Sequence, residues 1–247
     1  LGHATEPRQR HGPVIWFHAA SVGESLSVLA LINRMGIALP QAQFLITSGT
    51  ATSARLIATR LPAKTAHQFA PLDSAGPLKR FLKHWRPDAA VFVESELWPQ
   101  MLRRTHASGA RMAMVNARLS EKSMIQWRKM PKLSAYMLGV FDLILTQNDA
   151  MAEAMVSLNA PADRVARGIH LKSLAGPLPI DADTVFEARA ALGHRPVWVA
   201  SSTHSGEEEV VLKAHKSLLK RYPNLCLILA PRHPERTGEA TGLITAA

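Results

Sequence analysis

The chain has 247 residues, which is enough for one large domain or two small ones. Hydrophobic residues make up 47% of it and charged residues 19%, a composition that excludes a disordered protein. The single cysteine, Cys226, excludes an internal disulfide framework and favours a reducing compartment. We find no run of 18 apolar residues and no signal peptide, so the sequence predicts no transmembrane helix within this chain.

The formal net charge of +10 lies in the N-terminal part. Residues 1–175 contain 21 Lys and Arg against 11 Asp and Glu, whereas residues 176–247 contain eight of each kind. The excess predicts anionic partners such as phosphates or an acidic membrane surface, with a generally basic solvated surface as the alternative. Nucleic acid is disfavoured as a partner, because aromatic residues are only 6% of the chain and no basic helix or stacking platform is visible.

Short apolar runs alternate with helical patterns along the chain. This alternation predicts an α/β protein with parallel sheets and right-handed crossovers. The predicted strands are 14–18, 43–47, 89–93, 112–115, 143–145, 197–200 and 225–229, and the predicted helices are 24–35, 52–61, 77–85, 99–107, 129–138, 150–158, 185–192 and 207–221.

A linker pattern interrupts this rhythm. The stretch "GPLPIDAD", residues 176–183, contains two prolines, and the charge excess ends at the same place. We therefore predict an N-terminal domain over residues 1–175 and a second domain over residues 176–247. The second part has about 70 residues and two predicted strands, too few for a complete doubly wound sheet, so we expect it to be the first part of a longer domain.

Polar residues follow most of the predicted strands, at the sheet edge where α/β proteins bind ligands. In "SVGE", Ser21 and Glu24 have the spacing of a capping box, in which a serine and a glutamate satisfy the first amides of a helix. Alternatively, Gly23 allows a tight turn that presents Glu24 as a carboxylate base. The local spacing does not separate the two interpretations.

Two further stretches of the N-terminal part carry candidate site residues. In "ESELWP", an extended backbone would place Glu94 and Glu96 on the same side of the chain; solvated carboxylates at a sheet edge are the alternative. In "TSGTATS", Ser48, Gly49 and Thr50 are typical of an anion site at a helix start, or of ordinary capping. This stretch lacks the lysine of a P-loop, and the chain has no G-x-G-x-x-G motif.

The second part offers candidates for binding a phosphate. In "SSTHSGEEE", hydroxyls stand at a predicted helix start, and the arginine of "PRHPER" is suited to gripping a phosphate; capping and a basic surface patch are the alternative. His204, Glu207 and His233 match no established metal-ligand spacing, so no metal site is predicted. Cys226 is expected in the core. The candidate donor-site residues are Ser202, Thr203, His204, Arg232 and His233.

The sequence resembles the 3-deoxy-D-manno-octulosonic acid (Kdo) transferases of lipopolysaccharide synthesis. The resemblance extends over nearly the whole chain, from His18 to Arg236. It rests on eight motifs in the order of the family: "HAASVGE", "TSGTATS", "PLD", "ESELWP", "NARLSEKS", "QN", "STHSGEE" and "PRHPER".

This resemblance implies a two-domain GT-B glycosyltransferase fold, with the donor CMP-Kdo held mainly by the C-terminal domain. The acceptor would be a lipid A precursor at the cytoplasmic face of the bacterial inner membrane, and no cofactor would be needed. The catalytic carboxylate of the family falls on Glu24, and a further acidic residue falls on Glu94 or Glu96. Arg118 and Ser120, in "NARLSEKS", join Ser48, Gly49 and Thr50 as candidates for binding the acceptor or an anion.

Three departures from the family pattern accompany the resemblance. The N-terminal anchor and the glycine-rich element that completes the nucleotide pocket are expected outside this chain. The "G-[NS]-L-K" element appears one residue longer, as "GIHLK", so Lys172 stands one position further from the glycine than the lysine of the family element. The alternatives are another GT-B glycosyltransferase with a different nucleotide sugar, and a non-catalytic module that binds anionic lipid.

Overall fold

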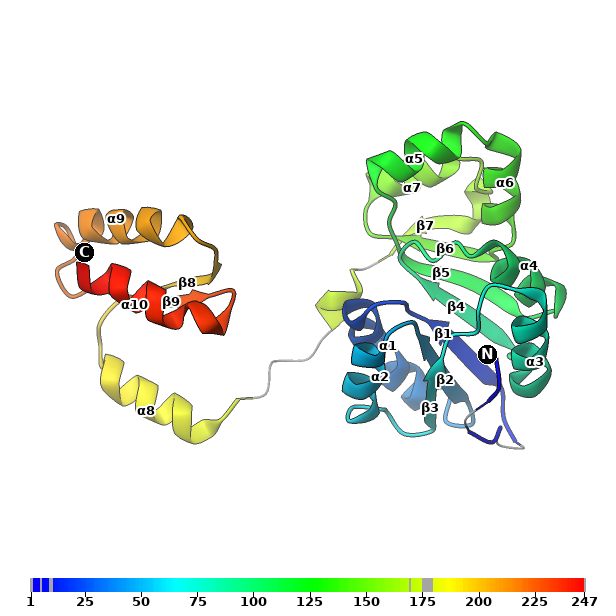
Figure 1. Cartoon of the computed structure of the whole chain (residues 1–247), viewed down its shortest axis with the longest axis horizontal. Coiled ribbons are helices and arrows are strands. Elements are labelled where there is room, and N and C mark those ends of the chain that lie inside the picture. The colour runs from blue at the N-terminus through cyan, green and yellow to red at the C-terminus, as the bar shows by residue number, and fades with distance from the viewer. Residues whose placement is uncertain (1, 5, 9–10, 169, 175–179, 247) are drawn as a thin grey trace. The chain divides into compact units, whose positions relative to one another are not determined.

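The structure, a computed structural model, describes residues 2–4, 6–8, 11–168, 170–174 and 180–246. Contacts divide the chain into two units, residues 1–176 and 177–247, which we call unit 1 and unit 2 (Figure 1). The predicted domain boundary near residue 176 and the side chain of Lys172 lie outside what the structure describes. Each unit is treated by itself below.

Unit 1 contains a parallel sheet with the strand order β3-β2-β1-β4-β5-β6-β7 in the described residues. All five residues of the central strand β1 are buried, as expected for a strand that is covered on both faces. The strands are β1 (Val14–His18), β2 (Gln43–Ser48), β3 (Thr65–Phe69), β4 (Ala89–Val93), β5 (Arg111–Ala117), β6 (Leu143–Thr146) and β7 (Val165–Arg167).

Helices connect these strands and cover the sheet (Figure 1). Side-chain caps at Ser21, Thr50, Ser120 and Asn148 start four of them, and a proline in the first turn starts α4 and α6. The helices are α1 (Val22–Ala38), α2 (Ala51–Ala58), α3 (Ala75–Trp85), α4 (Pro99–Ala107), α5 (Glu121–Arg128), α6 (Pro131–Gly139) and α7 (Asp149–Ser157), with the short 3-10 helices η1 (Ala162–Arg164) and η2 (Leu171–Leu174).

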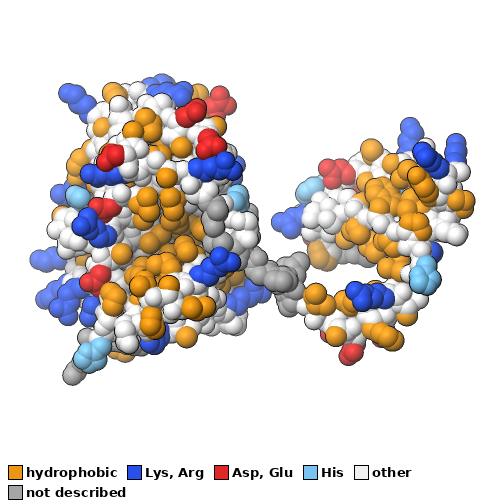
Figure 2. All heavy atoms as spheres, turned by 180° about the vertical axis from the view of Figure 1, so that it is seen from behind, with side chains coloured by type: hydrophobic (Ala, Val, Ile, Leu, Met, Phe, Trp, Pro, Cys, Tyr) orange, Lys and Arg blue, Asp and Glu red, His pale blue; other side chains and the backbone are white. Residues whose placement is uncertain are grey.

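The core of unit 1 lies on both faces of the sheet, because successive side chains of a strand point to opposite faces. Phe17 of β1 packs in one cluster with Ile32 of α1. Its neighbour Trp16 packs in the other cluster, where its ring lies 4.7 Å from that of Phe81 in α3. In Figure 2, apolar side chains gather in the middle of one face of unit 1, and Lys and Arg side chains lie along its margins.

Unit 2 contains a parallel pair of strands, β8 (Val197–Thr203) and β9 (Cys226–Pro231). The apolar side chains of Val199 and Ile228 remain exposed on this small sheet. No helix in the described parts of either unit is long and apolar enough to cross a membrane. The helices of unit 2 are α8 (Ala182–Leu192), α9 (Glu207–Leu219), η3 (Pro234–Arg236) and α10 (Thr237–Ala246).

All seven predicted strands occur, but the strands β3 and β7 and the helices α5 and α10 were not predicted. The sequence of β3, "TAHQF", is largely polar, and β7 has only three residues, so neither shows a clear apolar run. The helix predicted from residue 129 begins at Pro131 instead. The core prediction for Cys226 is wrong: this residue begins β9 and is partly exposed.

Candidate active site

The carboxyl ends of β1 and β4 meet at the point where the chain changes direction across the sheet. From β1 the chain runs outward through β2 to β3, then returns to β4 on the other side of β1. A crevice opens beyond the carboxyl ends of two neighbouring strands when the connections that follow them run to opposite sides. Glu24 lies in the first turn of the helix that follows β1, and Glu94 directly follows β4, so both lie at this switch point.

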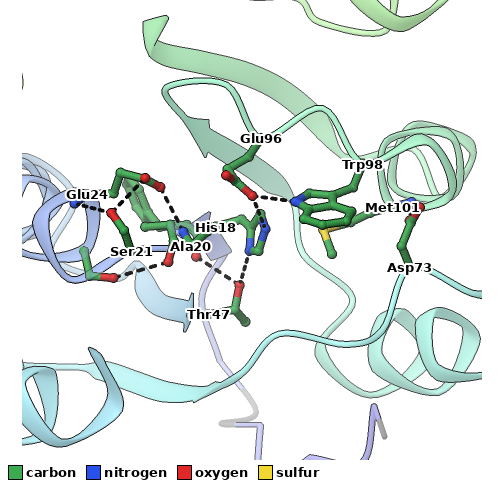
Figure 3. Close-up of polar contacts among 12 residues, drawn as sticks. His18, Ala20, Ser21, Glu24, Thr47, Asp73, Glu96, Trp98 and Met101 are labelled. Atoms are coloured by element: carbon green, nitrogen blue, oxygen red, sulfur yellow. Dashed lines mark hydrogen bonds and ion pairs between the residues drawn. The ribbon is translucent and has the colours of Figure 1, made fainter. Parts of the chain in front are cut away.

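Glu24 caps the helix α1 in this structure (Figure 3). The Ser21 hydroxyl accepts a hydrogen bond from the Glu24 amide (3.2 Å) and donates one to Glu24 Oε1 (2.8 Å). Glu24 Oε2 accepts from the amide of Ala20 (2.9 Å), one residue before the N-cap. The capping geometry therefore holds the carboxylate at the end of β1, while its role as a base stays a prediction.

Gly23 does not form the tight turn that the second interpretation of "SVGE" required. It lies inside the first turn of α1, and its φ is not in the left-handed region. A Cβ atom added to it would meet no heavy atom within 4 Å. The surface beside Glu24 at the start of α1 is therefore open.

The two carboxylates of "ESELWP" do not share a side of the chain, because the backbone does not stay extended. Glu94 has φ 59° and begins a turn directly after β4. Its Oε1 accepts a hydrogen bond from the side-chain amide of Asn116 at the end of β5 (3.2 Å). Glu96 lies beyond the turn and faces β1 instead. The condition for a shared side, an extended backbone through Glu94 and Glu96, is therefore not met.

Glu96 belongs to a polar cluster built around His18, the last residue of β1 (Figure 3). The ring of His18 is only 3% exposed, and its Nε2 lies 3.3 Å from Glu96 Oε2. The indole of Trp98 donates a hydrogen bond to the same oxygen. Burial acts to raise the pKa of Glu96, but the interactions with His18 and Trp98 outweigh it and hold the pKa below its usual value.

A pocket of about 210 Å³ opens beside this cluster. Asp73 of the "PLD" stretch lies in its wall and accepts a hydrogen bond from the Met101 amide (2.6 Å), which caps the start of α4. Sequence reasoning assigned no site role to His18, Asp73 or Trp98, although all three lie within the quoted motifs. The pocket is lined by His18, Ala20, Gly49, Ala70, Pro71, Leu72, Asp73, Glu96, Trp98 and Met101.

The residues after β2 serve largely local roles. Ser48 is buried and its hydroxyl bonds to Nε2 of His67 (2.9 Å), a histidine whose pKa is lowered by burial. Thr50 is the N-cap of α2 and accepts from the Ser53 amide (3.1 Å). Gly49 lines the pocket, and its amide donates to the carbonyl of Ala20 (3.3 Å). Of the three, only Gly49 faces the pocket.

Arg118 and Ser120 follow β5 at the same edge of the sheet. Arg118 is exposed to solvent. Ser120 is the N-cap of α5, where its hydroxyl accepts a hydrogen bond from the Ser123 amide (3.2 Å). Neither residue lines the pocket beside His18.

In unit 2, the predicted phosphate-binding residues gather at the carboxyl ends of β8 and β9. The amide of Arg232 donates to the carbonyl of Thr203 (2.9 Å), and the rings of His204 and His233 lie 6.1 Å apart. Ser202, with φ 60°, is exposed beside Thr203, which is buried. The structure therefore brings all five candidates of this unit together.

The start of α9 is crowded with carboxylates, which limits its use as an anion site. Three glutamates occupy the first turn after the N-cap Gly206. Glu207 accepts a hydrogen bond from the His204 amide (2.8 Å), and the buried Glu208 pairs with Arg236 (2.9 Å). Within the described residues, no three His, Cys, Asp or Glu side chains come together as a metal site.

Known proteins resemble this chain in sequence. Residues 1–174 match the family model described as 3-deoxy-D-manno-octulosonic-acid transferase (kdotransferase). The 3-deoxy-D-manno-octulosonic acid transferase of Rickettsia felis is 36% identical over 223 residues, which are 90% of this chain and 47% of that protein. A probable mitochondrial 3-deoxy-D-manno-octulosonic acid transferase of Arabidopsis thaliana is 33% identical over 239 residues, which cover 95% of this chain and 53% of that protein. The chain spans about half the length of these curated relatives.

Solved structures resemble the chain in fold. The UDP-GlcNAc 2-epimerase of Neisseria meningitidis, bound to UDP-GlcNAc, matches with a TM-score of 0.61 at 10% identity, over 95% of this chain and 70% of that one. A glycosyltransferase of Rickettsia africae matches with a TM-score of 0.62 at 13% identity, over 95% of this chain and 65% of that one. These likenesses confirm the predicted α/β fold of GT-B type. The match of residues 1–174 to the family model shows that the chain belongs to the 3-deoxy-D-manno-octulosonic acid transferase family.

Proposed function

We propose that this chain contributes the acceptor-side domain and the first part of the nucleotide-sugar-binding domain of an enzyme of lipopolysaccharide synthesis. The enzyme would transfer Kdo from CMP-Kdo to a lipid A precursor at the cytoplasmic face of the bacterial inner membrane. Within the family, the observation that carries this proposal is the position of Glu24, whose carboxylate is held at the switch point between β1 and β4. The open surface beside Gly23 gives an acceptor room to approach it.

Glu24 acts as the general base in this proposal. A sugar hydroxyl is a weak nucleophile, so Glu24 takes its proton while the hydroxyl oxygen bonds to the anomeric carbon of Kdo. The bond from that carbon to the phosphate oxygen of CMP breaks, through a transition state with oxocarbenium character. The Ala20 amide orients Oε2, whereas Oε1 is bonded to the Ser21 hydroxyl, which can rotate away. Oε1 is therefore the oxygen that we assign to accept the proton.

The leaving phosphate is assigned to unit 2. Ser202, Thr203 and Arg232 would donate to it at the ends of β8 and β9, with His204 and His233 beside them. The step needs no cofactor, because the nucleotide itself is the leaving group. In unit 1, Glu96 is favoured over Glu94 as the second functional carboxylate, since Glu96 lines the pocket and Glu94 is turned toward Asn116.

Replacement of Glu24 tests the assignment of the base. In the full-length protein, Glu24→Gln should bind CMP-Kdo nearly as wild type, because the amide keeps one acceptor and the shape of the side chain. Transfer of radiolabelled Kdo to a lipid A precursor should fall roughly a hundredfold or more. Glu121→Gln is the matched control, since Glu121 also lies in the first turn of a helix but begins α5.

Two results would contradict the proposal. If Glu24→Gln lowered the melting temperature and left the rate of transfer intact, Glu24 would be a capping residue only. If UDP, and not CMP, protected the protein against thermal unfolding, the donor would be a different nucleotide sugar. Each result overturns a separate part of the assignment, the first the base and the second the donor.

A further inference from the structure

The helix α5 and its C-cap residue present an outward face with two lysines and an isoleucine. No residue of α5 is buried, and the helix leans on the core through Met124 and Trp127. Lys122, Ile125 and Lys129 follow one another at spacings of three and four, so they share a face away from those two contacts. Ile125 is 46% exposed on that face. The exposed part of this aliphatic side chain, which lies between two lysines in solvent, gains no hydrophobic stabilisation from the folded unit itself.

The next helix, α6, extends this apolar exposure. Its residues Ser134, Met137 and Leu138 are buried against the core. Met130, Leu133 and Tyr136 recur every three residues and are 43%, 41% and 50% exposed. The helices α5 and α6 contact each other and lie together at one end of unit 1 (Figure 1). We call their exposed side chains the α5–α6 surface: Lys122, Ile125, Arg128, Lys129, Met130, Lys132, Leu133 and Tyr136.

The charge of this surface is strongly one-sided. Between residues 121 and 136 there are four cations, and Glu121 is the only carboxylate. None of the four cations forms an ion pair with another described residue. Elsewhere in unit 1, Arg111 and Arg167 do have carboxylate partners. The surface therefore combines exposed apolar side chains with positive charge that unit 1 does not balance.

We propose that the α5–α6 surface docks on a lipid bilayer that contains anionic lipids. The apolar side chains would enter the boundary between headgroups and acyl chains, and the cations would meet the headgroup phosphates. A second copy of the chain fits less well, because it would bring cations against cations. Nucleic acid would satisfy the charges but leave the apolar side chains without a partner.

The position of the surface suits the proposed acceptor. The helix α5 is capped by Ser120, shortly after β5 ends at Ala117, and the same strand carries the Asn116 that holds Glu94. Docking would therefore hold the carboxyl edge of the sheet close to the bilayer. This link to a lipid acceptor rests on the proposed function, but the test below measures lipid contact without any transfer reaction. The two proposals can thus fail separately.

A local fluorescent probe tests the contact in the full-length protein. In a Cys226→Ser background, a polarity-sensitive fluorophore is attached to Ile125→Cys or Leu133→Cys. Ile37→Cys is the matched control, because Ile37 is also an exposed isoleucine but lies near the end of α1. With vesicles of phosphatidylcholine and phosphatidylglycerol, emission at positions 125 and 133 should shift to the blue, while position 37 stays unchanged. Pure phosphatidylcholine vesicles should give little shift.

Removing charge from the surface should weaken the contact in a graded way. In the Ile125→Cys protein, Lys129→Gln with Lys132→Gln should raise the vesicle concentration for a half-maximal shift about 30-fold, the factor expected for two surface cations. The control pair, Arg103→Gln with Arg104→Gln, removes the same charge from α4. It should change the vesicle concentration for a half-maximal shift by less than about threefold.

Three outcomes would overturn the proposal. The first is the absence of a blue shift at both surface positions, and the second is an equal shift at position 37. The third is a shift without vesicles that grows with protein concentration, which would show that a second copy covers the surface. Circular dichroism of each variant verifies folding, and the substituted side chains are exposed apart from those of Cys226 and Arg104, which are partly exposed.

Discussion

The two ring nitrogens of His18 face different groups, and this defines the hydrogen-bonding roles in the polar cluster. Trp16 can only donate, so the Thr47 hydroxyl oxygen accepts from its indole (2.8 Å). The carboxylate of Glu96 can only accept, so its contact with His18 Nε2 is favourable when that nitrogen carries the ring proton. The other ring nitrogen, Nδ1, lies 3.0 Å from the Thr47 hydroxyl. This arrangement fixes Glu96, and through it Trp98, at the edge of the pocket.

The lowered pKa of Glu96 makes a prediction about stability. A carboxyl group with a depressed pKa in the folded state stabilises the fold above its unfolded value of 4.5, and this contribution is lost as the pH falls below 4.5. We expect Glu96→Gln to flatten the decline of the melting temperature with pH in that window, measured by thermal unfolding from pH 6 to pH 3. Glu153→Gln, on the exposed side of α7, is the control. Identical curves for wild type and Glu96→Gln would refute the assignment.

At the scale of the element, α4 depends on a residue outside itself. Its N-cap, Trp98, makes no side-chain cap, and Pro99 in the first turn lacks an amide hydrogen. Asp73, from the loop before α3, instead accepts hydrogen bonds from the amides of Met101 and Gln100. A carboxylate at this end also interacts favourably with the helix dipole. The "PLD" stretch therefore joins two helices that are separate in the sequence.

Removing this cap should destabilise unit 1. We expect Asp73→Ala to lower the free energy of unfolding by about 1–2 kcal/mol, the usual cost of losing a capping side chain. Urea unfolding followed by circular dichroism measures the change. Asp163→Ala, in the exposed 3-10 helix η1, should alter the free energy by less than about 0.5 kcal/mol. Equal effects of the two substitutions would show that the contact of Asp73 with α4 does not matter for stability.

At the scale of the whole molecule, unit 2 has its own ion pair and its own small core. Glu208, in the first turn of α9, is 0% exposed and meets Arg236, which also pairs with Glu239. The hydrogen bonds from Arg236 hold the pKa of Glu208 below its usual value. A buried carboxylate that loses its partner is costly, because its charge is no longer compensated. The stability of unit 2 should therefore depend on this pair.

We predict that Arg236→Gln destabilises unit 2 selectively. In differential scanning calorimetry of the full-length protein, the transition of the domain containing unit 2 should move to lower temperature. The transition of unit 1 should stay in place, because the two units have separate cores. Lys220→Gln removes one exposed cation from the end of α9 and should move neither transition. A parallel downward shift of both transitions in Arg236→Gln would contradict the assignment of this ion pair to unit 2 alone.

Much of the fold could be predicted because it follows from local patterns. The apolar runs of β1 and β4 gave their exact observed bounds, since strands covered on both faces read as continuous apolar segments. The spacing of Ser21 and Glu24 likewise indicated the cap that the structure contains. The helix α5 was missed because only Met124 and Trp127 attach it to the core, so it lacks the apolar stripe of a packed helix.

The sequence by itself determined the α/β alternation, the polar strand ends and the family motifs, because these depend on residue type and short-range spacing. Only the tertiary structure decided which carboxylates meet which partners. Glu96 pairs with His18, 78 positions earlier, and Glu94 turns away to Asn116, since the backbone bends where an extended chain was expected. Such contacts arise from sheet order and backbone conformation, which bring together residues that no local pattern connects.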